Sequence, residues 1–299
     1  MPVHSGKQRR VERRSHLAVT ALTAAVDYRV QTASMTRPAG AIDVLFHPPQ
    51  GSCASARAAL EVLDRCGIAA AFVSQCRQWT CERQWLCVES RLEDVLRFTR
   101  ESARFVGLAG YNPMDIAESM REIESAAELG FRGVYFRCDT FAMRLGDSRV
   151  FPLLAKAGEL RLPVVLQLGL GEPDAVNLLE RMAAEFSELP MAAVMPIVDE
   201  RMAALLERSD NLSLVLDATA LAGLNRTHRH LLDSAAFLDR CMWASNGADP
   251  MASLDGVAVL QLAPPLLEQL LRGTAMRFFS PPERTRTPRS LSEEVVVAE

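Results

Sequence analysis

Residues 133–168 read GVYFRCDTFAMRLGDSRVFPLLAKAGELRLPVVLQL. The stretch begins with a short apolar run, Gly133–Arg137, and ends with another, Pro163–Leu168, whose uninterrupted valine and leucine content is typical of a parallel strand buried on both faces. Between them, Asp147 precedes a helical pattern with Pro152 in its first turns, where proline is tolerated. A strand, a helix and a second strand in this order predict a βαβ unit with parallel strands.

The same alternation continues in both directions along the chain. Eight strand-like runs are separated by segments whose apolar residues lie three and four positions apart, the spacing of one helix face. Eight such units in roughly 250 residues fit a closed barrel better than an open sheet. We therefore predict an α/β fold, a (β/α)8 TIM barrel over residues 41–280. The eight runs are Ile42–Phe46, Ile68–Ser74, Phe105–Ala109, Gly133–Arg137, Pro163–Leu168, Met191–Met195, Leu212–Asp217 and Cys241–Ser245.

The composition narrows the class of protein. The 299 residues carry a formal net charge of −4, which gives no basis for binding nucleic acid or an anionic membrane surface. The seven cysteines, an odd number, do not form the pattern of a secreted disulfide framework and suit a reducing compartment. No apolar run is long enough to span a bilayer. We expect a cytoplasmic globular protein with neither nucleic-acid nor membrane partners.

The two end segments differ from the predicted barrel. Residues 1–40 contain a basic cluster, Lys7–Arg14, followed by an apolar stretch, Leu17–Val26. The favoured interpretations are a disordered basic tail or a translation start at Met35. A signal peptide is the third, but no small-residue cleavage site follows Val26. Residues 281–299 are rich in Pro, Arg, Ser and Thr and are predicted to form a flexible C-terminal tail.

A barrel of this type carries out its chemistry at the carboxyl ends of its strands. The informative residues are therefore those that end each apolar run. Titratable and polar side chains among them can bind a substrate, transfer protons or hold a metal ion. These residues are His47, Cys76, Tyr111, Asn112, Arg137, Cys138, Asp139, Gln167, Met195, Asp217 and Asn246.

Several stretches, in order and with plausible spacing, resemble one known family. They are Ile42–Pro48, Arg104–Gly110, Leu129–Val134, Pro152–Val165 and Leu271–Phe279. Together they resemble the amidohydrolase-2 family, metal-dependent TIM-barrel hydrolases and decarboxylases, over about residues 41 to 280. The resemblance implies a divalent metal held by two His on the first strand, His residues on the fifth and sixth strands and an Asp on the eighth. It also implies that this metal activates water or polarises a substrate oxygen.

The sequence departs from that ligand set at nearly every position. The corresponding residues are Leu45, His47, Gln167, Met195 and Asn246. Leucine has no lone pair, a thioether is a poor ligand for zinc or manganese, and neutral amides bind weakly. We therefore expect most metal ligands to be replaced and no metal cofactor to be bound, with Zn or Mn held only if the ligands are unusual.

No alternative alignment restores the missing ligands. The chain has five histidines, and two of them, His4 and His16, lie in the N-terminal segment. His228 and His230 lie in a basic stretch beyond the seventh strand, where a solvated helix face is favoured over a metal role. Cys76, Cys81 and Cys87 follow the second strand with Trp79 and Trp85 between them. Their spacing is not that of a compact zinc motif, so packing residues in a loop are favoured over a zinc site.

Acid–base chemistry without a metal is the other possibility at this end of the barrel. His47 with Asp139, Asp217 or Asp249 can form an acid–base pair. Arg137 can hold a carboxylate or phosphate in a bidentate contact. Catalytic candidates are accordingly His47, Arg137, Asp139 and Asp217. Candidate substrate-binding residues are Tyr111, which can also donate a proton, Gln167 and Asn246.

These observations leave three interpretations of function. The first is a non-catalytic barrel that is a partner or regulatory subunit of an active relative, in a homo- or hetero-oligomer with an amidohydrolase-like protein. The second is a metal-independent lyase, isomerase or decarboxylase acting on a small carboxylated molecule. The third is a metal-dependent hydrolase with an altered ligand set. In the second and third, a small molecule binds at the carboxyl ends of the strands.

Overall fold

A computed structural model describes most of the predicted barrel. The described residues are 40–47, 56–74, 77–80, 85–88, 92–112, 115–140, 143–169 and 174–280, with the backbone alone at 77–80, 85–88, 139–140 and 143. The predictions for residues 1–39 and 281–299, including the basic tail, the start at Met35 and the C-terminal tail, lie outside the described residues.

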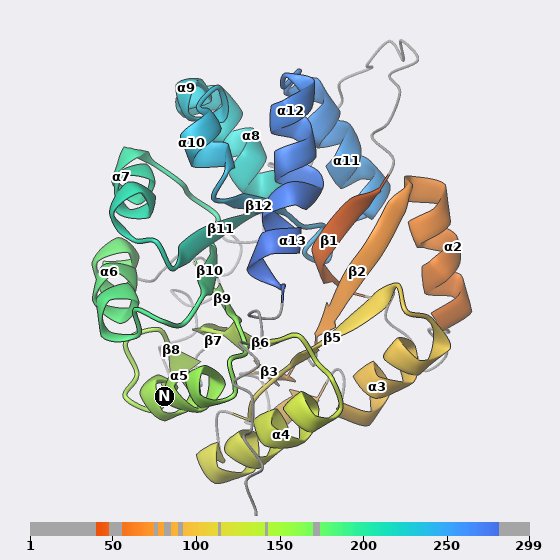
Figure 1. The fold of residues 1–299 in the computed structure, drawn as a ribbon, viewed down its shortest axis with the longest axis vertical. Coiled ribbons are helices and arrows are strands. Elements are labelled where there is room, and N and C mark those ends of the chain that lie inside the picture. Colours follow the sequence, from red (N-terminus) through yellow and green to blue (C-terminus); the bar gives the residue numbers. More distant parts are fainter. Residues whose placement is uncertain are drawn as a thin grey trace, which may run out of the picture. The chain divides into compact units, whose positions relative to one another are not determined.

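Eight parallel strands form the central sheet (Figure 1). Each strand pairs with the next one of this sheet along the chain, and the register is regular over the pairs formed by the fifth to eighth strands. All eight predicted runs are confirmed as strands, with ends that differ by one or two residues in several cases. The strands, in spatial order, are β1 Ala41–Phe46, β2 Ile68–Ser74, β5 Phe105–Ala109, β6 Gly133–Arg137, β9 Val164–Gln167, β10 Met191–Val194, β11 Leu212–Leu216 and β12 Cys241–Trp243.

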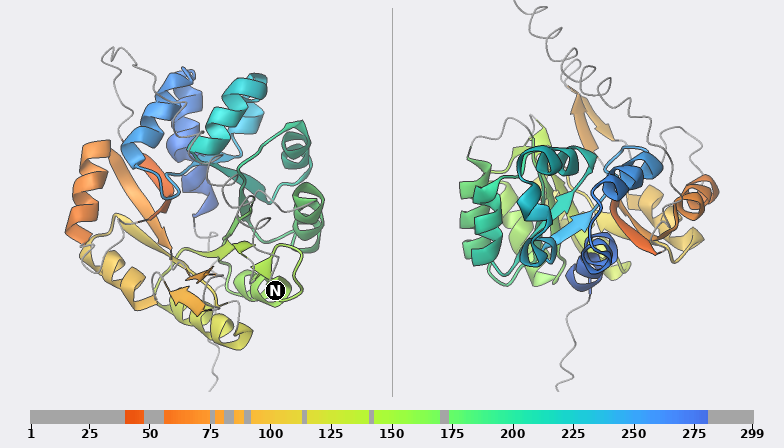
Figure 2. Two further views of the ribbon diagram at one scale, coloured as in Figure 1. Left: turned by 180° about the vertical axis from the view of Figure 1, so that it is seen from behind. Right: turned by 90° about the horizontal axis from the view of Figure 1, so that it is seen from above.

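Helices surround the strands, as Figure 2 also shows from behind. They alternate with the strands along the chain, so the predicted (β/α)8 TIM barrel is confirmed. Two short antiparallel hairpins extend the loops after β2 and β6: β3 Arg77–Thr80 with β4 Trp85–Val88, and β7 Asp139–Thr140 with β8 Met143–Arg144. The helices are α2 Ala56–Cys66, α3 Leu92–Glu101, α4 Ile116–Glu128, α5 Val150–Glu159, α6 Ala175–Glu185, α7 Glu200–Arg208, α8 Ala218–Thr227, α9 Arg229–Leu232, α10 Ala235–Leu238, α11 Pro250–Val259, α12 Pro264–Glu268, the π-helical η1 Gln269–Gly273 and α13 Thr274–Phe278.

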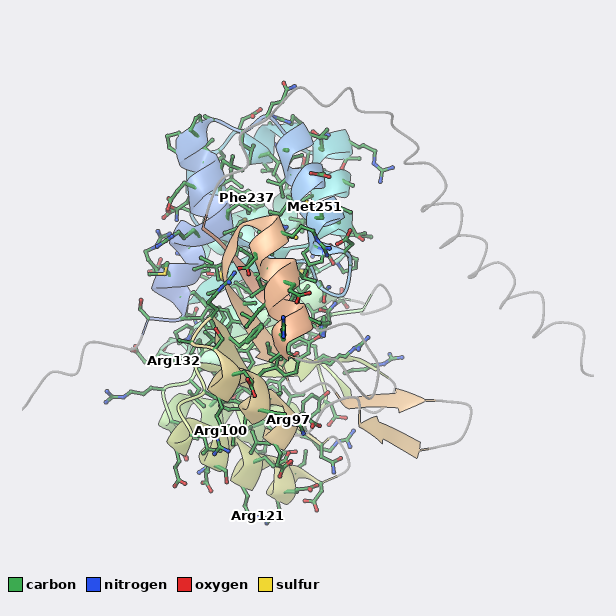
Figure 3. All side chains as sticks on the ribbon, turned by 90° about the vertical axis from the view of Figure 1, so that its right-hand side faces the viewer. Arg97, Arg100, Arg121, Arg132, Phe237 and Met251 are labelled. Carbon is green, nitrogen blue, oxygen red and sulfur yellow. The ribbon has the colours of Figure 1, made fainter. Side chains whose placement is uncertain are left out.

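Local sequence explains where several helices begin and end. Asp115 caps α4 by accepting a hydrogen bond from the Glu118 backbone N–H at 2.8 Å. Gly130, with φ +84°, follows the C-cap of the same helix, where a left-handed residue ends helices and glycine has no Cβ to clash. On the outer faces, arginines such as Arg97, Arg100 and Arg121 project away from the sheet (Figure 3). Within the described residues, no helix is long and apolar enough to cross a membrane.

Side chains alternate along each strand and form two apolar clusters. The outer cluster lies between the strands and the helices and includes Phe46, Phe136 and Leu166. The inner cluster fills the barrel and includes Leu45, Tyr135 and Val165. At the amino-terminal ends of the strands, the Phe279 ring stacks on the Phe72 ring with centroids 3.9 Å apart, so the residues around α13 close this end of the interior.

The barrel closes between β1 and β12, at a junction that we call the seam. No regular ladder of backbone hydrogen bonds joins β1 to β12. The pairing register of β1 with β2 is also irregular in two places. Instead, the Asn246 backbone N–H donates to the Leu45 carbonyl at 3.0 Å. The Ser245 backbone N–H donates to the Asp43 carboxylate at 3.0 Å. A polar side chain thus takes part in a contact that backbone groups make elsewhere in the sheet.

Candidate functional site

The alternation of side chains brings residues from distant parts of the sequence to the carboxyl ends of the strands, which we call the mouth. Tyr135, Val165, Val215 and Ala244 belong to the inner cluster. Arg137 and Gln167, two positions after Tyr135 and Val165 on the same strands, therefore face the barrel interior at the mouth. Asp217 and Asn246 follow the ends of β11 and β12, and His47 follows β1. Arg137 and Gln167 are directly paired across β6 and β9.

His47 is half-buried and directly follows β1. Its ring lies 6.4 Å from the Tyr135 ring, centroid to centroid, in an edge-on arrangement. On the other side, a Cβ added at Gly247 would lie 3.7 Å from His47 Cδ2. The imidazole is therefore held between β6 and the loop that follows β12.

Leu45 is a structural residue of the barrel interior. Its side chain is fully buried in the inner cluster. Its backbone N–H donates to Asp43 Oδ1 at 3.2 Å, and its carbonyl accepts from the Asn246 N–H. The backbone of Leu45 thus takes part in the seam, while its hydrocarbon side chain packs in the interior and offers no ligand atom.

Asp217 and Asn246 interact with each other. One carboxylate oxygen of Asp217 caps helix α8 by accepting from the Thr219 and Ala220 N–H groups, both at 2.9 Å. The other accepts from the Asn246 side-chain amide at 3.0 Å. Asn246 itself has φ +47°, in the left-handed region where asparagine is among the better-tolerated residues. Both oxygens of this carboxylate thus serve a helix cap and a loop contact.

Gln167 contributes an acceptor that the described residues leave unused. Its side-chain oxygen Oε1 is buried and has no hydrogen-bond partner within the described part of the chain. A buried polar atom without a partner costs about 1–3 kcal/mol, so such atoms usually meet a ligand or an ordered water. Gln167 is the predicted substrate-binding residue whose placement best suits that role.

Other predicted site residues lie elsewhere. Tyr111 packs with the outer cluster, and its hydroxyl donates to the Arg137 carbonyl at 2.5 Å, so it orders the end of β6. Met195 also packs with the outer cluster, so the strand-six residue that faces the interior is Val194. Asp249 caps α11 by accepting from the Met251 N–H at 3.2 Å. Met195, predicted as a metal position, thus packs between the strands and the helices, while its neighbour Val194 belongs to the inner cluster.

Some predictions fall on side chains outside the described residues. Asp139 pairs through its backbone with Arg144 in the β7–β8 hairpin, but its side chain is not among those described. The side chains of Cys76, Cys81 and Cys87 also lie outside the described residues.

The histidine pair beyond β11 makes local contacts with a neighbouring helix. His228 Nδ1 lies 2.7 Å from Glu200 Oε1 of α7. The His228 and His230 rings are 6.3 Å apart. These contacts connect helices of the outer layer and do not place either ring at the mouth.

Asp43 is a notable residue that the sequence analysis overlooked. It is fully buried in β1; burial raises its pKa from 3.8 to about 6, while hydrogen bonds from Ser245 and from the Leu45 N–H hold it lower than burial alone would. Oδ1 accepts both backbone N–H bonds, whereas Oδ2 has no hydrogen-bond partner among the described residues. One signal in the sequence could have identified it, since a carboxylate interrupts the apolar run Ala41–Phe46.

The described donors at the mouth do not match the ligand set that the family resemblance implies. Its positions hold one imidazole, His47, with a hydrocarbon at Leu45 and neutral amides at Gln167 and Asn246. The Asn246 amide nitrogen is already bound to Asp217. Divalent zinc or manganese needs several imidazole or carboxylate donors. Among the described residues, no three His, Cys, Asp or Glu side chains are grouped so that they could hold a metal ion.

Comparisons with known proteins agree with the fold. No curated protein matches the chain. An uncharacterized TIM-barrel protein, Bb4693, from Bordetella bronchiseptica has a TM-score of 0.65 at 19% identity, covering 80% of this chain and 98% of that chain. A probable 2-pyrone-4,6-dicarboxylic acid hydrolase from Acinetobacter baumannii, with citric acid bound, has a TM-score of 0.55 at 10% identity, covering 80% and 99%. A 2,6-dihydroxybenzoate decarboxylase complexed with 2,6-dihydroxybenzoate has a TM-score of 0.55 at 11% identity, covering 81% and 99%.

The family is shown by the extent of a sequence match. A family model described as Amidohydrolase matches residues 24–280. This range contains all eight strands of the barrel and the helices between them. The chain therefore belongs to the amidohydrolase family.

Proposed function

We propose that this chain is an amidohydrolase-family barrel that does not use the family's metal and acts as a non-catalytic partner or regulatory subunit of an active relative. The observation that carries the proposal is the structural use of the metal positions. Leu45 and Asn246 close the seam through a backbone hydrogen bond, and Asn246 also binds the carboxylate that caps α8. Residues that would hold a metal in an active member here support the barrel itself.

Retention of the fold without the metal is physically reasonable. The apolar interior and the helix–strand contacts provide the stability of such a barrel, so loss of a site at its rim leaves the core intact. Surface loops and helices remain available for association with another barrel. Most soluble oligomers consist of subunits with the same fold, because they are homo-oligomers. These points support a subunit that contributes a surface.

Metal analysis tests the first half of the proposal. The protein is expressed with supplementary zinc and manganese, desalted, and measured by elemental analysis beside an active metal-bearing member of the family. We expect far less than one equivalent in this chain and about one or more in the control. About one equivalent of metal that disappears in a His47→Ala variant would contradict the proposal and revive a metal-dependent hydrolase with altered ligands.

Association with an active relative tests the second half. Four large apolar side chains are exposed on the described surface: Leu129, Ile197, Val259 and Met276. Each is replaced in turn by Asp, and binding to the relative, with its activity and melting temperature, is measured for each variant and for His47→Ala. We expect His47→Ala to behave as the unchanged protein and at least one surface variant to weaken binding about tenfold or more. The proposal fails if the unchanged chain has no effect on the relative.

A metal-independent enzyme acting on a small carboxylated molecule is the second candidate. The observation that favours it is the set of groups at the mouth: the His47 imidazole, the Arg137 guanidinium and the Gln167 oxygen, which has no hydrogen-bond partner among the described residues. One structural neighbour is named as a dicarboxylic acid hydrolase and was solved with citric acid. In this case His47→Ala abolishes a cellular phenotype that the surface variants preserve. Arg137→Lys retains the charge but not the bidentate geometry, so it weakens substrate binding.

A further inference from the structure

A hollow lies at the end of the barrel opposite the mouth. It is formed by the amino-terminal ends of β10, β11 and β12 together with the C-terminal helix α13. Its volume is about 410 Å³, within the range of sites for small molecules. None of the residues considered for the mouth lines it, and all its lining residues are described.

Two arginines line this hollow, and one of them has no carboxylate partner. Arg240 is half-buried and donates to the Leu212 carbonyl at 3.1 and 2.7 Å and to the Ser209 carbonyl at 2.5 Å. Every partner of its guanidinium in the described part of the chain is a backbone carbonyl, so no anion neutralises its charge there. A half-buried guanidinium without an anionic partner is a favourable binding group for a carboxylate or phosphate.

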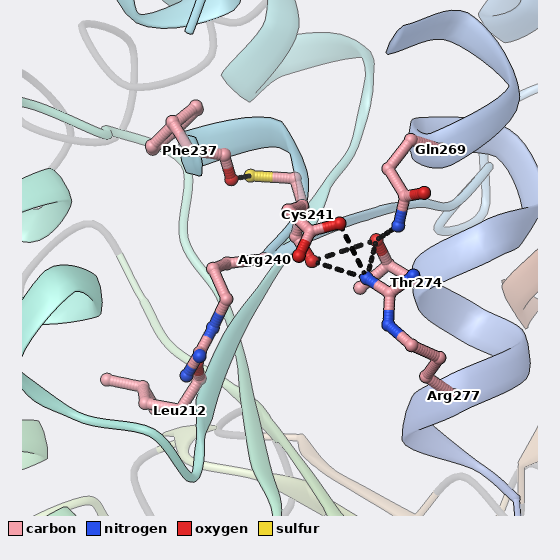
Figure 4. A network of polar contacts seen from close by, with 8 residues as sticks. Leu212, Phe237, Arg240, Cys241, Gln269, Thr274 and Arg277 are labelled. Carbon is pink, nitrogen blue, oxygen red and sulfur yellow. Dashed lines mark hydrogen bonds and ion pairs between the residues drawn. The ribbon is translucent and has the colours of Figure 1, made fainter. Parts of the chain in front are cut away.

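The second arginine, Arg277, donates hydrogen bonds from only one of its three guanidinium nitrogens within the described residues. Arg277 Nη2 donates to the carbonyl and the carboxylate of Asp239, both at 2.9 Å, next to the buried Thr274 (Figure 4). Arg277 Nε and Nη1 make no hydrogen bond within the described residues. They are the groups with which a planar carboxylate could form a bidentate contact.

A serine adds a hydroxyl group to the wall of the hollow. Ser213 is 9% exposed, lines the hollow, and lies two residues before the inward-facing Val215 on β11. Its side chain has no hydrogen-bond partner among the described residues. This hydroxyl can therefore donate to or accept from a polar group bound in the hollow.

The outer rim of the hollow has the opposite charge. Glu188 and Asp210 are exposed there, and neither forms an ion pair with a described residue. These carboxylates would repel a molecule that carries only negative charge, while the arginines would repel one that carries only positive charge. Phe278 adds an apolar wall.

We propose that this hollow binds a small zwitterion, a molecule with a carboxylate and an ammonium group on an apolar skeleton, as in a free amino acid. The carboxylate is held by Arg240, Arg277 and the Ser213 hydroxyl. The ammonium group lies toward Glu188 and Asp210, and the hydrocarbon part packs on Phe278. The mouth plays no part in this binding.

Calorimetry on the full chain tests the proposal with three matched probes. L-leucine carries both charges, 4-methylpentanoate is the same skeleton without the amino group, and 3-methylbutylamine lacks the carboxylate. We expect L-leucine to bind and each single-charge probe to bind about tenfold or more weakly. The proposal is overturned if L-leucine does not bind at millimolar concentration, or if either single-charge probe binds as well.

Variants locate the binding. We expect Arg277→Gln to weaken L-leucine binding about tenfold or more. Ser213→Val, which fills the space and removes the hydroxyl, should do the same. Arg97→Gln, on the outer face of α3, and His47→Ala, at the mouth, are the controls and should leave binding unchanged. Circular dichroism confirms folding of each variant. Loss of binding in His47→Ala, or retention in both hollow variants, would place the ligand elsewhere and refute the proposal.

Discussion

The seam and the strands β9 to β11 join their neighbours in different ways. Strands β9, β10 and β11 pair residue by residue without irregularity, and their side chains are almost all apolar. At the seam, Asp43, Ser245 and Asn246 make the contacts, and β1 is irregular against β2. The difference teaches that an apolar pattern suffices for a regular parallel sheet, whereas closing the barrel depends here on individual polar side chains.

The largest expected effect is the loss of the buried carboxyl group at the seam. Asp43→Ala leaves the Leu45 and Ser245 backbone N–H groups without their acceptor. At about pH 4.5, we expect a loss of about 4 kcal/mol in the free energy of unfolding, measured with urea. Asp43→Asn keeps an acceptor oxygen and should lose less than about 1 kcal/mol. Equal losses in the two variants would show that these hydrogen bonds do not hold the seam.

The next effect is a pH dependence that belongs to the seam. Because the folded pKa of Asp43 is raised from 3.8 to about 6, the folded state retains its proton between these values while the unfolded state releases it. The contribution of Asp43 to stability therefore falls as the pH rises through this window, by up to about 3 kcal/mol, and is constant above it. The measurement is the unfolding free energy of the unchanged protein minus that of Asp43→Asn, from pH 4 to 7. A flat difference would contradict the raised pKa.

A substitution in the regularly paired strands β9 to β11 should lower stability by an amount that does not depend on pH. Val165 is fully buried in the inner cluster on β9. We expect Val165→Ala to lose about 2.5 kcal/mol through the cavity that it leaves. The loss should be the same at pH 4.5 and 7, because no titratable group is involved. A pH-dependent loss would indicate that the two regions are coupled, and the comparison would need revision.

The smallest effect concerns the contact between Asp217 and Asn246. Asp217→Ala removes the cap of α8 and the acceptor of the Asn246 amide, and we expect a loss of about 1.5 kcal/mol. The matched control is Asp249→Ala, which removes the cap of α11 and should lose about 1 kcal/mol. Thermal or urea unfolding of both variants gives the comparison. Identical losses would mean that the Asn246 contact adds nothing to the seam.

Much of the fold could be predicted because periodic patterns reflect burial directly. All eight apolar runs are strands in the structure, and α4 begins after Asp115 and ends before Gly130, residue types typical of helix ends. The candidate site was harder, because facing directions depend on exact strand ends. Met195 was assigned to the metal position of the sixth strand, and in the structure Val194 packs with the inner cluster while Met195 packs with the outer one. Asp43 was overlooked, since its acceptor role depends on Ser245, which lies 202 residues away.

The sequence by itself determined the βα alternation, the barrel and the chemical types of residue at the metal positions, because these follow from periodicity and from which atoms carry lone pairs. Only the tertiary structure decided that Asp217 is committed to a cap and to Asn246, that Tyr111 orders β6, and that two arginines and a serine border a hollow at the far end. Such contacts join residues far apart in the chain, and local patterns do not encode which distant partner a side chain meets.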